Sequence, residues 1–400
     1  MNEMEKKNLF LEIADENLFF LAGEINEEYN FEILEKLSVK SSGVYKGKII
    51  DIEKISENLK NSLEKIENKI DHTFKSINII SNQKKIDCVN VTGFKKLNGE
   101  QILNEDISHI INYLKKNVIE NETQKKIIHL FNSKYLLDKQ NIKNLPIGLH
   151  GEFYSHQLTF FLLNKNDFKN IQMLLRKSNL ALNRIIFKNY VDGINVIKED
   201  KMTTSFINVN IEKDNIQISV FDDSSFVYYE NFEFGLEIIL KDIIKVCSLH
   251  YENAKNILSE VKIDGIYSQD KKIYIDKRFF KNENFRKISI EHLRNIIEAR
   301  IVEILDIIYN KNINLINIKK NKPILVKITQ DETFKNLITI IQKNINNNQD
   351  VKISSRTQND EFNSCIISAD LVNNGWIKEA IPFTKNKKSL ISRIFSKLFE

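Results

Sequence analysis

The stretch FINVNIEKDNIQISVFDDSSFVYYENF, residues 206–232, decides the fold. It contains three short segments rich in Ile, Val, Phe and Tyr, and the residues between them are mostly Asp, Asn, Lys and Ser. Strand-forming runs separated by turn-forming residues predict a meander of three antiparallel strands. The predicted strands are Phe206–Val209, Ile216–Phe221 and Ser225–Phe232.

The same pattern opens the chain. Alternating residues around Phe10 and the segment Leu18–Ile25 predict a β-hairpin that turns at residues 15–17, and Phe31–Ser38 predicts a third strand. Helical periodicity follows each meander, with Asp51 as the expected N-cap of the first helix. The predicted helices are Asp51–Ile70 after the first meander, and Leu236–Cys247, Glu252–Val261 and the longest, Ile288–Tyr309, after the second. Two such series predict a duplicated α/β unit.

One stretch interrupts the first series. Residues 85–164 alternate between strand-like and helical segments, which predicts a small inserted α+β subdomain. The pattern restarts after Asp192-Gly193, where we place a domain boundary. The predicted domains are 1–84 with 165–192 as the first half, 85–164 as the insert, 193–375 as the second half, 376–388 as a linker and 389–400 as an amphipathic helix.

Composition excludes several classes of protein. The 42% hydrophobic and 10% aromatic residues suffice for real cores, and 59 basic against 54 acidic residues leave a net charge of only +5, too little to indicate nucleic-acid binding. The three cysteines are far apart, which argues against a disulfide framework and favours a reducing compartment. No run of 18 apolar residues occurs. We therefore expect a cytoplasmic protein, attached to a membrane peripherally if at all.

The sequence lacks the motifs of common catalytic sites. No two of the seven histidines stand at helical i,i+4 spacing, and His150 and His156 are interpreted as surface or packing residues. No two of the eleven glycines are adjacent or form G-x-G, so any nucleotide site must do without a glycine-rich phosphate loop. The acidic pairs at 222–223 and 331–332 are typical of turns. We expect no catalytic residues and no metal site.

The final segment, KNKKSLISRIFSKLFE, predicts a membrane-binding helix. At 100° per residue its apolar side chains fill one half of a helix and its cations lie on the other half or just upstream, as in helices that lie in the membrane plane. The expected membrane-binding residues are Leu390, Ile391, Ile394, Phe395, Leu398 and Phe399, with Lys387, Lys388, Arg393 and Lys397 facing anionic headgroups. The alternative is a terminal helix that packs on the body of the protein. One such helix binds weakly, so we expect membrane binding to be coupled to self-association.

Several stretches together resemble the bacterial actin-like cell-division protein family FtsA. HLFNSKYLLDKQNIKNLPIGLHG (129–151) is similar to part of that family's characteristic insert and is the most specific of them. The others are LEIADENLFFLAGEI (11–25), SSGVYKGKIIDIEKISENLKNSLEKIE (41–67), FGLEIILKDI (234–243), IIEARIVEIL (296–305) and SLISRIFSKLFE (389–400). The resemblance implies an actin-like fold, a duplicated ribonuclease H-like α/β architecture with an SHS2-type inserted subdomain and a C-terminal amphipathic helix.

The resemblance also implies ATP and Mg²⁺ as cofactors, and here the sequence departs from the family. The first phosphate hairpin reads Glu12-Ile13-Ala14-Asp15 in place of Asp-Ile-Gly, and the second, Asn210 to Asp214, has lost its glycines. The positions that match the nucleotide site are Gly235, Arg300, Glu303 and Thr329. Carboxylates at Glu212 and Asp214 oppose a triphosphate, so both cofactors are doubtful in this chain.

By resemblance, the chain is a cell-division adaptor. FtsA-like proteins tether filaments of the tubulin-like FtsZ to the inner face of the cytoplasmic membrane, polymerise, and recruit later divisome proteins. The FtsZ C-terminal tail is then expected on residues 240–310, and neighbouring subunits and later partners on the insert. Two alternatives stay open: an actin-fold ATPase, and the actin-like scaffold of type IV pilus assembly.

Overall fold

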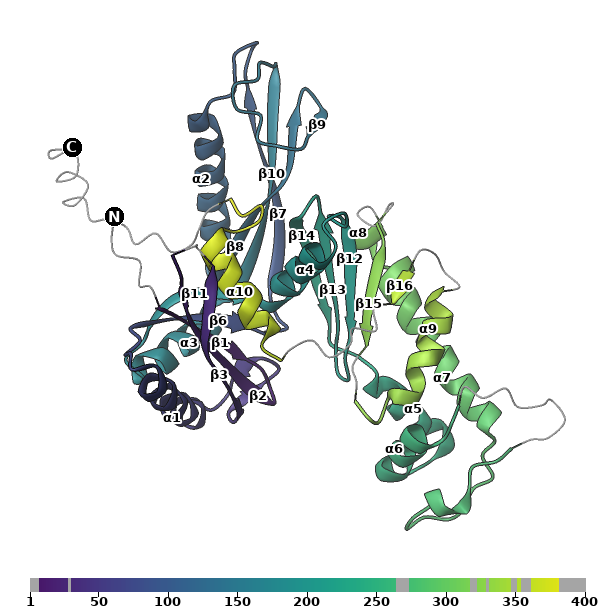
Figure 1. The fold of residues 1–400 in the computed structure, drawn as a ribbon. Helices are drawn as coiled ribbons and strands as arrows, with labels where there is room; N and C mark the ends of the chain where they lie inside the picture. Colours follow the sequence, from purple (N-terminus) through teal and green to yellow (C-terminus); the bar gives the residue numbers. More distant parts are fainter. Residues whose placement is uncertain are drawn as a thin grey trace. The chain divides into compact units, whose positions relative to one another are not determined.

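The computed structural model describes most of the chain (Figure 1). The described residues are 7–27, 30–263, 273–316, 322–328, 331–346, 351–353 and 361–380. They form two compact units, of which the first comprises 1–204, 221–228 and 358–400 and the second 205–220 and 229–357. The predicted boundary at 192–193 falls inside a helix, α4 (Lys188–Glu199), that the sequence pattern did not reveal.

A five-stranded sheet forms the body of the first unit. Its strand order is β11-β6-β1-β2-β3; β1, β2 and β3 pair antiparallel, and β6 and β11 add in parallel to β1. The strands are β1 (Lys7–Ile13), β2 (Asn17–Ile25), β3 (Phe31–Lys40), β6 (Ser76–Ser81) and β11 (Ala181–Phe187). A two-stranded hairpin, β4 (Val44–Tyr45) with β5 (Lys48–Ile49), follows β3. The predicted opening meander is therefore confirmed.

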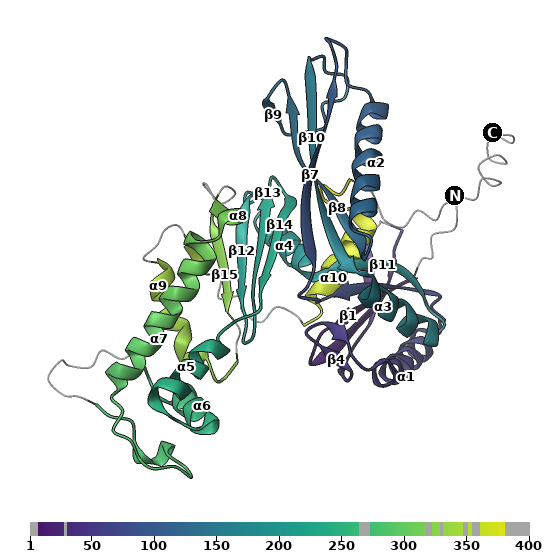
Figure 2. The ribbon, with the colours of Figure 1, turned by 180° about the vertical axis from the view of Figure 1, so that it is seen from behind.

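Two pairs of helices pack on this sheet. In α1 (Ile52–Ile70) the predicted N-cap is confirmed, because the Asp51 carboxylate accepts the Lys54 N–H. The buried face of α1 contacts β3 and α3 (Lys165–Lys177). The other pair is α4 and α10 (Asn363–Asn374), which contact each other; α10 also lies against β1 and β2 (Figure 2). The sequence pattern did not reveal α10 either.

The insert is a four-stranded antiparallel sheet with one helix on its face. Its strand order is β7-β10-β8-β9, and α2 (Asn104–Asn121) packs along one side (Figure 2). The strands are β7 (Asp87–Lys96), β8 (Lys125–Leu137), β9 (Gln140–Ile142) and β10 (Phe153–Asn164). The core between sheet and helix is continuous, from Ile107 and Ile110 on α2 to Leu158 and Phe160 on β10.

A second five-stranded sheet repeats the strand order of the first; most of it belongs to the second unit, and residues 221–228 are counted with the first. This sheet runs β14-β13-β12-β15-β16, with β15 and β16 parallel to β12. The strands are β12 (Phe206–Ile211), β13 (Ile216–Asp222), β14 (Ser225–Phe232), β15 (Ile324–Ile328) and β16 (Val351–Ile353). An identical order of a three-strand meander followed by two parallel strands confirms the predicted duplication.

Helices connect the strands of the second unit. Helix α5 packs against α6 and α7, and α7 also packs against α9. Their bounds are α5 (Glu237–Cys247), α6 (Tyr251–Glu260), α7 (Ile290–Leu305), α8 (Ile313–Ile316) and α9 (Ile338–Asn346). The predicted helix 288–309 is shorter than expected, because α7 ends at Leu305 and a five-residue π-helical turn follows. The longest described helix is α1, at 19 residues.

Several predicted features lie outside the described residues. These are the whole amphipathic segment, with Lys387, Lys388, Leu390, Ile391, Arg393, Ile394, Phe395, Lys397, Leu398 and Phe399, and also Thr329. Among the helices that the structure does describe, none is long and apolar enough to cross a membrane.

Candidate functional site

At the first hairpin, between β1 and β2, a buried carboxylate pairs with a lysine whose side chain is 23% exposed. Glu12 on β1 is only 2% exposed, and its carboxylate binds the ammonium of Lys188 at the start of α4. Lys188 Nζ also donates to Ser364 Oγ on α10, at 2.8 Å. Within the described part of the chain, Glu12 Oε2 has no hydrogen-bond partner. These side chains tie one strand and two helices together at the hairpin.

Neighbouring carboxylates keep Lys188 protonated. Burial acts to lower the pKa of this ammonium, but the nearby carboxylates of Glu12 and Asp192 outweigh burial and raise the pKa above its usual value. Lys188 therefore stays protonated at neutral pH and neutralises Glu12 without any external cation.

The turn of the first hairpin is fixed by a side chain as well. The Asp15 carboxylate accepts the N–H of Gly47, at 2.7 Å, from the short connection between β4 and β5. Within the turn, the Ala14 N–H donates to the Asn17 carbonyl, at 3.2 Å. Asp15 thus binds a neighbouring loop through its carboxylate, and it follows Ala14, which stands where the FtsA-like pattern has glycine.

The second hairpin, between β12 and β13, is closed by backbone. The N–H groups of Leu236 and Glu237, at the start of α5, donate to the carbonyls of Glu212 and Lys213, at 3.0 and 2.8 Å. A Cβ at Gly235 would lie 2.7 Å from the Asn215 nitrogen and closer still to those two carbonyl oxygens. The turn fits against the start of α5 only because residue 235 has no side chain.

Arg300 and Glu303 form a brace on the helices behind this hairpin. The Arg300 guanidinium on α7 binds the Asp242 carboxylate on α5, with Nη2 at 3.0 Å from Oδ1, and Nη1 lies 2.5 Å from Glu303 Oε2. Hydrogen bonding to Asp242 is the main cause of the raised pKa of Arg300. Gly235 thus lies shortly before α5, and Arg300 binds a side chain of α5. The nucleotide role of Gly235, Arg300, Glu303 and Thr329 stays a prediction.

The residues at the two hairpins do not fit a magnesium nucleotide. The first N–H groups of a helix are a ready anion site, but two at the start of α5 are already bound to the hairpin carbonyls. Glu212 and Asp214 put negative charge in the second hairpin, and Lys188 already serves as the counter-ion of Glu12. Among the described residues, no group of three or more His, Cys, Asp or Glu could hold a metal ion. We therefore derive no step through ATP or Mg²⁺.

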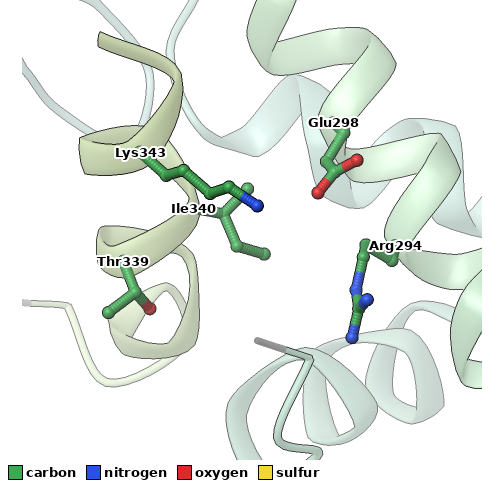
Figure 3. Close-up of a pocket in the computed structure, with 5 residues that line it drawn as sticks. All are labelled: Arg294, Glu298, Thr339, Ile340 and Lys343. Carbon is green, nitrogen blue, oxygen red and sulfur yellow. The ribbon is translucent and has the colours of Figure 1, made fainter. Parts of the chain in front are cut away.

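A pocket of about 220 Å³ lies between α7 and α9. Figure 3 shows Lys343 and Glu298 pointing into the same space from the two helices, with Ile340 at its side. The remaining lining residues are Arg294, whose Nε donates to the carbonyl of Ile263 at 2.9 Å, and Thr339. Two cations beside one carboxylate and one apolar side chain suit a peptide that carries both acidic and apolar groups.

The sequence pattern missed a second buried polar cluster, in the first unit. His129, Arg184 and Glu379 come together from β8, β11 and the segment after α10. No spacing links these residues, because they are 55 and 195 positions apart, so only the tertiary structure could reveal the cluster. His156 is fully buried and its ring donates to Asn132 Oδ1 at 2.9 Å, which agrees with a packing role.

Comparison with known proteins shows what this chain is similar to. The family model described as "SHS2 domain inserted in FTSA" matches residues 83–155, which cover the insert up to the start of β10. The cell division protein FtsA of Buchnera aphidicola (subspecies Acyrthosiphon pisum) is 27% identical over 309 residues, 76% of this chain and 72% of that protein. The resemblance to FtsA is confirmed. Escherichia coli FtsA is 21% identical over 308 residues, again 76% of this chain and 72% of that protein.

Solved structures support the fold. The chain is similar to one in the PilM-PilN type IV pilus biogenesis complex, with a TM-score of 0.52, 9% identity, and coverage of 92% of this chain and 96% of that one. At this identity the similarity shows the fold alone. The fold is the predicted actin-like one: a duplicated α/β unit with an SHS2 insert, as in FtsA.

Proposed function

We propose that this chain is a cell-division adaptor that holds FtsZ filaments at the cytoplasmic face of the membrane. The observation that carries the proposal is the SHS2 insert of the FtsA type within a duplicated α/β body, together with relatives that are cell division proteins. The proposed role is structural and not catalytic, because side chains at the first hairpin and backbone carbonyls at the second are engaged with the protein itself.

The FtsZ C-terminal tail is proposed to bind the pocket between α7 and α9. Arg294 and Lys343 provide charge for carboxylates and Ile340 provides an apolar contact. A pull-down with the FtsZ tail peptide tests this. We expect binding that is equal with and without ATP and Mg²⁺, and absence of binding in both states would remove the adaptor role.

Charge reversal localises the site. Arg294→Glu is expected to weaken peptide binding at least about tenfold, since loss of a charge-assisted contact is replaced by repulsion. The matched control is Lys335→Glu, an exposed lysine that pairs with Glu332 outside the pocket. Equal loss in both variants would mean that net charge, and not the pocket, governs binding.

The amphipathic segment 389–400 is proposed as the membrane anchor, together with self-assembly that multiplies its weak binding. Liposome flotation of the full chain and of a chain that ends at Lys388 tests this. We expect the shortened chain to stay unbound on vesicles that contain anionic lipid; undiminished flotation would remove the anchor. Neighbouring subunits and later divisome proteins are proposed to bind the insert.

A further inference from the structure

The segment that follows α10 contacts the insert through one isolated antiparallel β-bridge. We call residues 375–380 the strap. The Asn132 N–H donates to the Lys378 carbonyl, at 2.9 Å, and the Ala380 N–H donates to the Leu130 carbonyl, at 2.8 Å. This antiparallel bridge lies on the outer edge of β8, next to the stretch that pairs with β9 (Figure 1). The strap therefore fills a part of that edge which would otherwise be open.

A buried polar cluster fixes the strap in place. The Glu379 carboxylate, 1% exposed, binds the Arg184 guanidinium and lies 2.9 Å from His129 Nδ1. His129 Nε2 accepts the Phe187 N–H at 3.0 Å, so the ring proton is on Nδ1 and donates to Glu379. Burial lowers the pKa of His129 and keeps the ring neutral. Arg184 and Glu379 thus balance each other, and one strap residue satisfies two buried groups.

Aromatic contacts cover the cluster. The Arg184 guanidinium lies 3.4 Å from the ring centroid of Trp376, the single tryptophan of the chain. Tyr190 stacks on Trp376 and its hydroxyl donates to the Ile377 carbonyl, at 3.2 Å. The strap is therefore held mostly by side chains, with only two backbone hydrogen bonds to β8.

The buried cluster fixes the register of the strap more than it adds to the stability of the fold. Desolvation offsets much of the attraction in a buried ion pair, and apolar residues of similar size often stabilise a core equally well. Slippage by one residue, however, would turn Glu379 to the other side of the strand and leave Arg184 and His129 unpaired. The cluster allows one register only. Gly375, the first residue of the strap, follows α10 directly; its φ is +102° and no atom lies within 4 Å of its Cβ position.

We propose that the outer edge of β8 is a strand-docking site whose occupant is the chain's own strap, and that the strap is a releasable latch set by Glu379. Release would free six residues, with a fully extended length of roughly 20 Å, and would open the edge of β8 at Leu130 and Asn132. The latch does not depend on the proposed membrane role.

Limited trypsin digestion followed by mass spectrometry tests the latch without lipid or partner. Lys378 lies in the strap. In the unmodified chain we expect cleavage after Lys378 to be at least about tenfold slower than in a free peptide of the same sequence. Rates are divided by those of free peptides with the same sequence, because residue 379 itself affects trypsin.

Glu379→Gln is expected to raise the corrected Lys378 rate by about tenfold or more, since cleavage follows the population of the released strap. Trp376 fluorescence should shift to the red as the ring enters water. The matched control is Asp370→Asn on α10, which breaks the exposed pair with Lys198 and should change neither signal.

A second variant keeps the test independent of the buried charges. Ala380→Pro removes the N–H that bonds to the Leu130 carbonyl and is expected to raise Lys378 cleavage even if Glu379→Gln fails to fold. The latch is refuted if the unmodified chain is cut at Lys378 as fast as the free peptide, or if neither variant raises the rate. It is also refuted if hydrogen exchange in Glu379→Gln rises equally throughout the first unit, which would make the cluster an ordinary part of the core.

Discussion

The two halves of the molecule share one strand order but close their first hairpins by different means. In the first half a side-chain ion pair, Glu12 with Lys188, joins β1 to α4. In the second half the carbonyls of Glu212 and Lys213 accept N–H groups from the start of α5, and Gly235 allows the close approach. In the second half the Lys213 ammonium also lies 3.7 Å from the Glu237 carboxylate. A side-chain ion pair thus makes the contact in the first half, whereas backbone hydrogen bonds accompany a longer ion pair in the second.

In both halves the protein's own groups contact the hairpin. A hairpin built to bind phosphate leaves backbone N–H groups free. Here the protein's own carboxylates, ammonium and carbonyl groups meet one another at both places. The two closures should therefore respond differently to substitution and to pH.

The largest effect is expected from Lys188→Met. This change leaves the Glu12 carboxylate buried without its partner, which should lower the free energy of unfolding by about 3 kcal/mol or more. Urea unfolding measures the loss. Lys198→Met, on the same helix but in an exposed pair with Asp370, should cost less than about 1 kcal/mol. Adding Glu12→Leu to Lys188→Met should restore most of the stability; no restoration would contradict the ion-pair closure.

Stability measured at alkaline pH gives a second test of the Glu12–Lys188 pair. A raised pKa of Lys188 means that its contribution is complete below the unfolded-state pKa, about 10.4, and is lost as pH rises through the higher folded-state value. The difference between Lys188→Met and the unmodified chain should therefore be constant from pH 7 to 10 and shrink above that. A difference that shrank already near neutral pH would disagree with this assignment.

A somewhat smaller loss is expected from Gly235→Ala in the second half. The new methyl group meets backbone atoms of the hairpin, which cannot rotate away, so the helix or the turn must shift at a cost of about 2–3 kcal/mol. Thermal unfolding measures it. Gly148→Ala is the control, because its φ is +81° but nothing lies within 4 Å of its Cβ position; it should cost about 1 kcal/mol. Because φ of Gly235 is not positive, a loss no larger than that of Gly148→Ala would mean that small shifts relieve the contact at 235.

His156, in the insert that only the first half carries, should make the stability of the protein sensitive to acid. Burial lowers the pKa of His156 to about 4, whereas the unfolded-state value is about 6.5. The unfolded chain binds more protons between these values, so stability present above pH 6.5 should fall by up to about 3 kcal/mol on acidification to pH 4. His156→Gln should flatten this dependence, while the exposed His150→Gln should leave it unchanged. Urea midpoints at pH 4.5 and 7 distinguish the two.

The smallest effect is expected from the brace in the second half. Arg300 is 25% exposed and its partner Asp242 24% exposed, so the pair should contribute about 1 kcal/mol or less. A double-mutant cycle with Arg300→Ala and Asp242→Ala measures the coupling. A coupling well above 2 kcal/mol would make the helices of the second half depend on charge as the first hairpin does.

Local patterns predicted much of the architecture. Alternation around residues 206–232 predicted the second meander, and the spacing over Asp51–Ile70 predicted α1 with its N-cap. The pattern failed at α4 and α10. Both contain polar residues on faces that the sequence alone shows as exposed, such as Asn195 and Ser368, yet these side chains are buried against neighbouring elements. The end of α7 was misplaced because the π-helical turn continues the same apolar stripe.

The sequence by itself determined the repeated strand order, the existence of the insert and the loss of glycine from both hairpins, because each depends on residues that are close together in the chain. Only the tertiary structure decided that Lys188 neutralises Glu12, that α10 belongs with the first unit, and that Glu379 meets Arg184 and His129 beside β8. Those partners are far apart in sequence, and a charged residue carries no local sign of whether it faces water or another charge.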